Sequence, residues 1–201
     1  MDTIELKKYH RTAGFVDEHT TRPKDILSKI KTIFGNVTLT KEGQNKRPIE
    51  FYEFFINDKP FSEILTEFCK LNYSLLDNWV GVLGSFSNKK SELITIKRLL
   101  LQQITEQEIR DVFPKDLDKY YLENGIENYR EELADEEIII YGCLECGDYG
   151  CGGFKIKVDK EGEQFLWTYN DEGNFLQFHF DQHQYFDTFD SYRKTIENEN
   201  N

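Results

Sequence analysis

The spacing of apolar residues predicts that much of the first two-thirds of the chain forms amphipathic helices. In 61–71, apolar residues recur three and four positions apart and would lie on one side of a helix. The same reading predicts helices over 22–36, 92–103, 105–113 and 116–133. Thr105 and Glu108 have the spacing of a capping box. Extended runs over 37–40 and 49–57 supply a few strands between the helices.

In the last third of the chain the pattern changes to short strand-like runs separated by Gly, Asp and Asn. These runs predict strands over 136–144, 154–158, 164–170 and 174–180. Their connections are too short for parallel crossovers, so the strands should pair antiparallel. Asp181 is expected to cap a final helix over 182–196, which carries an apolar stripe of Tyr185, Phe189, Tyr192 and Ile196.

The predicted fold class is therefore α+β. A helical N-terminal two-thirds with a few strands is followed by a C-terminal antiparallel meander closed by a helix. The 201 residues include 16 Phe and 11 Tyr, enough aromatic side chains to build one sizeable core. No stretch has the composition of a linker, and we expect a single domain over 1–196 with a disordered tail over 197–201.

The sequence shows no targeting or membrane-spanning segment. The first residues, MDTIELKKYHRT, lack the apolar stretch of a secretory signal. The longest uncharged apolar run is about seven residues, whereas a helix needs roughly 20 to cross a bilayer. We therefore expect a cytoplasmic protein with reduced thiols and no membrane partner.

Charge narrows the classes of partner. The net charge is −12, and 105–137 holds twelve Asp and Glu against four Lys and Arg, an excess of eight negative charges. Such a segment repels nucleic acid and attracts basic proteins. A solvated helix face that only keeps the protein soluble is the alternative interpretation.

The stretch YGCLECGDYGCGGF, 141–154, is the main candidate for chemistry, because it holds three of the four cysteines. Cys143 and Cys146 have the spacing of a zinc knuckle, and Cys151 could be a third ligand. The possible fourth ligands are distant in sequence: Cys69, His179 and His183. A redox role is disfavoured, because the glycines after Cys146 prevent the helix that such a motif opens. The favoured interpretation is a tight turn between two strands, in which the glycines adopt positive φ.

This stretch and the residues after it resemble a family of uncharacterised bacterial proteins. The family carries Cys-x-x-Cys-Gly-Asp-x-Gly-Cys-Gly between strands, then a strand with Trp, then Phe-x-Phe-Asp-x-x-Gln-Tyr before the last helix. The matching residues are Cys143, Cys146, Gly147, Asp148, Gly150, Cys151, Gly152, Trp167, Phe178, Phe180, Asp181, Gln184 and Tyr185. The family pattern does not call for histidine at positions 179 and 183, which weakens a zinc site completed by either one. The resemblance covers about the last third of the chain and implies a fold but no activity.

No catalytic constellation stands out, so we do not expect an enzyme or a resident cofactor. The sequence instead favours an acidic binding protein that neutralises a basic protein, in the manner of a bacterial immunity protein against a polymorphic toxin. The residues expected to contact the partner are Glu106, Glu108, Asp111, Asp116, Asp118, Tyr120, Tyr121, Glu123, Glu127 and Tyr129. The alternatives are a small structural zinc module and an enzyme of unrecognised type.

Overall fold

The computed structural model describes residues 1–12, 48–85, 88–143 and 153–198. The chain divides into two compact units, one made of Met1–Tyr9 with Glu50–Asn201 and the other of His10–Ile49. The helices and sheets described below belong to the first unit, apart from the outer ends of two strands. The helix predicted over 22–36 and the strand predicted over 37–40 lie outside the described residues.

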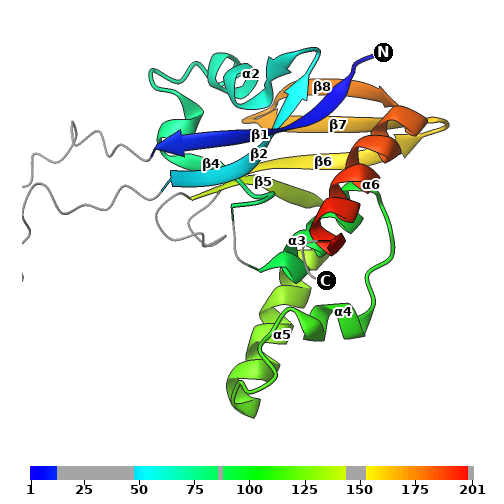
Figure 1. Ribbon diagram of the computed structural model, residues 1–201. Helices are drawn as coiled ribbons and strands as arrows, with labels where there is room; N and C mark the ends of the chain where they lie inside the picture. The colour runs from blue at the N-terminus through cyan, green and yellow to red at the C-terminus, as the bar shows by residue number, and fades with distance from the viewer. Residues whose placement is uncertain (13–47, 86–87, 144–152, 199–201) are drawn as a thin grey trace, which may run out of the picture. The chain divides into compact units, whose positions relative to one another are not determined.

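Eight strands form two antiparallel sheets in the described part of the chain (Figure 1). The three-stranded sheet contains β1 (Ile4–Thr12), β2 (Pro48–Ile56) and β3 (Lys59–Pro60). The five-stranded sheet contains β4 (Trp79–Gly81), β5 (Glu137–Cys143), β6 (Gly153–Glu161), β7 (Gln164–Asp171) and β8 (Asn174–Asp181), paired in chain order. A two-residue turn with positive φ at Glu172 and Gly173 joins β7 to β8, and its backbone twist matches that of the strands.

The helices are α2 (Phe61–Phe68), α3 (Lys89–Leu99), α4 (Glu106–Asp111), α5 (Lys119–Ala134) and α6 (Gln182–Asn198), with a short 3-10 helix at Leu75–Asp77. Helix α6 packs on β7, β8 and α3 (Figure 1). Helix α4 contacts both α3 and α5. The predicted caps are present: Thr105 and Glu108 form the capping box of α4, and Asp181 accepts hydrogen bonds from the first amides of α6. None of the helices in the described ranges is long and apolar enough to cross a membrane.

The core is built from aromatic side chains around Trp167 of β7. The indole nitrogen of Trp167 donates a hydrogen bond to the Tyr185 hydroxyl over 2.7 Å, and that hydroxyl donates to the carbonyl of Leu99 over 3.0 Å. Phe165 stacks on the Tyr185 ring with 4.3 Å between centroids. Trp167, Tyr185 and Leu99 are all buried. One hydroxyl therefore ties the five-stranded sheet to α6 and to the end of α3.

Single backbone hydrogen bonds join the two sheets at both sides. The amide of Tyr52 in β2 donates to the carbonyl of Leu83, just after β4, over 2.7 Å. The amide of Asp2 donates to the carbonyl of His179 in β8, also over 2.7 Å. Phe54 of β2 also packs edge-to-face on Trp167 of β7, and both are buried, so the two sheets share one core.

The α+β class is confirmed, as is the antiparallel order β5–β8 followed by a helix. The prediction of a helical N-terminal two-thirds is wrong, because that part of the chain supplies all of the three-stranded sheet and also β4. The largest omission was β1, whose sequence IELKKYHRT has too many exposed charged residues to give a clear strand pattern. Its strand conformation follows from pairing with β2, which is distant in sequence.

Replacing Tyr185 with phenylalanine would remove the hydroxyl that Trp167 and Leu99 share. The buried indole N–H and the buried carbonyl would both lose their partner, while the packing of the ring would be kept. We expect Tyr185→Phe to lower the free energy of unfolding by about 1–3 kcal/mol, measured by urea denaturation. Tyr120→Phe, at an exposed position, is the matched control and should change it by less than about 0.5 kcal/mol. Equal stability of the two variants would contradict this role.

Candidate functional site

The most exposed aromatic pair in the predicted contact region is Tyr120 with Tyr121, in the first turn of α5. Their side chains are 71% and 66% exposed, and their rings form an edge-to-face pair with 5.6 Å between centroids. The side chain of Asp118 caps α5 by accepting a hydrogen bond from the amide of Tyr120 over 2.9 Å. The cap fixes the first turn of the helix and so the direction in which the two tyrosines project. We call the exposed side chains of residues 105–131 the α4–α5 surface.

Ion pairs across α4 and α5 hold part of this surface in place. Arg130 pairs with both Glu106 and Glu127, and Arg110 pairs with both Glu106 and Glu123. The pKa of Glu106 lies below its ordinary value, mainly because Arg130 donates hydrogen bonds to its carboxylate. Such solvent-exposed pairs contribute little stability individually, but as a network they fix how α4 packs against α5. These three carboxylates are therefore partly neutralised within the protein.

Three other predicted contact residues also have contacts inside the protein. Glu108 pairs with Lys97 of α3 in addition to its capping role. Asp111 accepts a hydrogen bond from the side chain of Gln107 over 2.9 Å. Tyr129 is half-buried, packs edge-to-face against Phe113 and lies within hydrogen-bond distance of the Ser91 hydroxyl.

The structure thus sorts the ten predicted contact residues into two groups. Seven of them pair, cap or pack within the protein, as described above. Tyr120, Tyr121 and Asp116 are exposed, and Asp116 makes no ion pair or side-chain hydrogen bond with any residue that the structure describes. The two tyrosines are the part of the predicted set that is most available to a partner.

The zinc hypothesis falls mainly on a segment that the structure does not describe, because Cys146 and Cys151 lie in 144–152. Cys143 ends β5 and faces Trp79 of β4 across the sheet. Within the described ranges, no three His, Cys, Asp or Glu side chains lie close enough together to hold a metal ion. The zinc site and the tight-turn interpretation both stay predictions.

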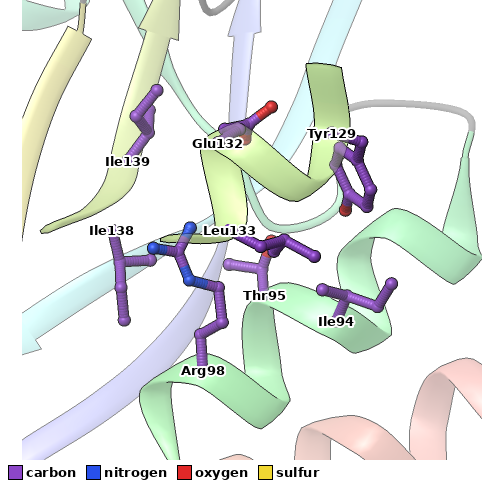
Figure 2. A pocket seen from close by; sticks show the side chains of 8 residues that line it. All are labelled: Ile94, Thr95, Arg98, Tyr129, Glu132, Leu133, Ile138 and Ile139. Atoms are coloured by element: carbon purple, nitrogen blue, oxygen red, sulfur yellow. The ribbon is translucent and has the colours of Figure 1, made fainter. Parts of the chain in front are cut away.

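A small pocket lies between α3, α5 and β5 (Figure 2). Its volume of about 10 Å³ is enough for about one water molecule. Arg98 lines it and donates hydrogen bonds to the backbone carbonyls of Asp135 and Glu137, over 2.6 and 3.0 Å. Arg98 therefore fastens the end of α3 to the connection between α5 and β5, and the pocket is too small for a substrate.

A larger cavity of about 150 Å³ lies between β2, α3 and α6. Its lining consists of Lys8, Glu50, Phe51, Tyr52, Gly84, Lys89, Glu92, Tyr192, Thr195 and Ile196. The buried carboxylate of Glu92 accepts hydrogen bonds from the amide of Gly84 and the hydroxyl of Tyr192. Lys8 and Glu50 form an ion pair of 2.7 Å. The described lining contains no serine, cysteine or histidine that could act as a nucleophile, and Glu92 serves to hold a turn against α6.

Glu53 of β2 is a fully buried carboxyl group that sequence reasoning missed. Its Oε1 accepts hydrogen bonds from the Tyr141 hydroxyl of β5 and, over 3.3 Å, from the amide of Ser62 in α2. Its Oε2 has no hydrogen-bond partner among the described residues. Burial raises the pKa of Glu53 to about 7, although the hydrogen bonds from Tyr141 and Ser62 oppose the increase. The only signal in the sequence was a carboxylate inside the aromatic run 51–55.

No protein-family model matches the sequence, and neither a curated protein nor a solved structure matches it significantly. The resemblance to an uncharacterised bacterial family therefore stays a prediction. Function has to be argued from the surfaces and buried groups described above.

Glu53 predicts a distinct pH dependence of stability. Because its folded pKa of about 7 lies above the ordinary value of 4.5, folding favours the protonated form. The stability that protonated Glu53 contributes to the folded protein is fully present below pH 4.5 and is lost as the pH rises through 7. We therefore expect that, as the pH rises from 4 to 8, wild type loses about 3 kcal/mol of free energy of unfolding relative to Glu53→Gln.

Urea denaturation of both proteins across this pH range measures the shift. Glu63→Gln, at an exposed position on α2, is the matched control, and its difference from wild type should stay nearly constant. A difference between wild type and Glu53→Gln that does not vary with pH would show that folding does not raise the pKa of Glu53.

Proposed function

We propose that this chain is a binding protein that uses the α4–α5 surface to bind a basic protein. The observation that carries the proposal is the exposed pair of Tyr120 and Tyr121 on an acidic helix. Tyrosine is enriched among interface residues that dominate binding energy, because it buries a large area with little loss of side-chain freedom. The Asp118 cap holds the first turn in place, which lowers the entropy cost of binding.

The charge of the surface specifies the chemistry of the partner. The internal ion pairs tie Glu106, Glu123 and Glu127 to two arginines, but residues 105–131 still hold eight Asp and Glu against four Lys and Arg, an excess of four negative charges. A field of this sign speeds the encounter with a positively charged protein and disfavours nucleic acid. The proposed division of roles is that the carboxylates steer the partner and the two tyrosines anchor it.

The partner class that fits best is a basic toxin domain, with this chain acting as its cytoplasmic inhibitor. A basic surface on a nuclease or similar enzyme binds anionic substrate, and an acidic protein that covers this surface would block access. Inhibition of this kind requires no catalysis and no cofactor from the inhibitor. The proposal therefore describes a stoichiometric binding protein and not an enzyme.

Substitution of the tyrosine pair tests the proposal. The double variant Tyr120→Ala/Tyr121→Ala should lose retention of a basic partner from the native cell, and its affinity for the purified partner should fall at least about 30-fold. Raising the salt concentration should weaken the wild-type complex, chiefly through slower association. Pull-down with mass spectrometry identifies the partner, and calorimetry or biolayer interferometry measures the affinity.

Tyr73→Ala is the matched control, because Tyr73 is 40% exposed and lies outside the α4–α5 surface. It should retain the partner with wild-type affinity. An acidic or neutral partner, or a basic partner bound equally by the double variant, would contradict the proposal.

A further inference from the structure

The outer edge of the five-stranded sheet is β8 (Figure 1), and within the described residues only one end of this edge is paired with another segment. There Asp2 pairs with the strand as a one-residue parallel bridge opposite Phe180. Its amide donates to the carbonyl of His179 over 2.7 Å, and its carboxylate accepts from the amide of His179 over 2.8 Å. The backbone groups of His179 therefore point away from β7, and the chain itself shows that this edge accepts an added strand.

No other segment of the part of the chain that the structure describes pairs with the rest of this edge, which we call the open edge. The pairing of β7 with β8 runs without a register shift, so backbone groups alternate in direction along β8. Since His179 points outward, Gln177 and Phe175 do so too. Neither residue's backbone N–H or C=O has a partner among the described residues, and both residues are exposed. The Phe175 side chain is 62% exposed beside these groups.

Carboxylates flank the open edge at both ends. Asp171 and Glu172 lie at the turn that begins β8, whereas Asp2 and Asp181 lie at its far end. Antiparallel pairing with a second copy would place the turn of one copy beside the far end of the other and bring these carboxylates together. Like charges held that close repel, so a second copy is disfavoured. An extended segment with lysine or arginine at its ends would meet opposite charges instead.

We propose that the open edge of β8, at Phe175 and Gln177, binds an extended basic segment of another protein by strand addition. The N–H and C=O groups of both residues pair with the backbone of the segment, which gives up to four hydrogen bonds. An apolar side chain of the segment covers the exposed Phe175 ring. Basic residues at the two ends of the bound segment face the carboxylates that flank the edge. The site therefore selects a segment by its charge and by one apolar contact. This site is separate from the α4–α5 surface and does not rest on it.

Amide exchange tests the site directly. The probe is an eight-residue peptide of alternating lysine and valine, added to isotope-labelled full-length protein and followed by NMR. At saturating peptide, exchange of the Phe175 and Gln177 amides should slow at least tenfold. Exchange at Leu176 and Phe178 should change little, because alternation along the strand points their amides toward β7. This alternating pattern distinguishes strand addition from general stabilisation of the protein.

Two variants provide an independent measurement. Gln177→Pro removes one outward N–H without removing a bond to β7, a position at which edge strands tolerate proline. It should weaken peptide binding at least tenfold in fluorescence anisotropy, whereas Gln177→Ala, which keeps the N–H, should bind as wild type does. Thermal denaturation checks that both variants fold. If Gln177→Pro does not fold, the exchange measurement on the wild-type protein still tests the proposal.

Three results would overturn the proposal. The first is no binding at millimolar peptide. The second is binding that shifts only residues of the α4–α5 surface, which would show attraction of lysine to acidic helices. The third is exchange at Phe175 and Gln177 that becomes slower as the protein concentration rises in the absence of peptide. This result would identify a second copy as the occupant. None of these results contradicts the proposed role of the tyrosine pair.

Discussion

The structure depends most on the buried hydroxyl of Tyr185, because it satisfies two polar groups that burial would otherwise leave without partners. One is the indole N–H of Trp167 in β7, and the other is the carbonyl of Leu99. Leu99 is the last residue of α3, where helix carbonyls have no partner inside the helix. The two hydrogen bonds of the Tyr185 hydroxyl hold α6 against β7 and the end of α3.

Fixing the end of α3 also fixes the helices that carry the exposed tyrosines. Lys97, in the last turn of α3, pairs with Glu108 of α4, and Arg98 donates hydrogen bonds to the carbonyls of Asp135 and Glu137 that follow α5. Arg110 and Arg130 then join α4 to α5. A continuous series of contacts thus leads from the core to the first turn of α5. The tyrosines are exposed, and the helix that carries them is positioned by exposed ion pairs to α4 and by the hydrogen bonds of Arg98.

The parts of the fold that the sequence predicted are those determined locally. The stripe of Tyr185, Phe189, Tyr192 and Ile196 is buried as predicted, because helical spacing alone places these side chains on one side. Strand β1 was missed because its partner is distant in sequence and its own pattern is mostly charged. Glu53 was missed for a related reason. A carboxylate in a strand normally faces water, and only the approach of Tyr141 from the other sheet reveals that this one is buried.

In the proposed α4–α5 surface, the carboxylates attract the partner from a distance and the two tyrosines supply the close contacts. The carboxylates of Glu106, Glu123 and Glu127 already have arginine partners, so a basic protein would have to compete for them and would gain little from each. Their net field still acts at a distance, because an internal ion pair does not remove the excess charge around it. Close-range affinity must therefore come from exposed side chains that no internal ion pair engages. Tyr120 and Tyr121 meet that condition, and for this reason salt should act mainly on association while loss of the tyrosines acts on dissociation.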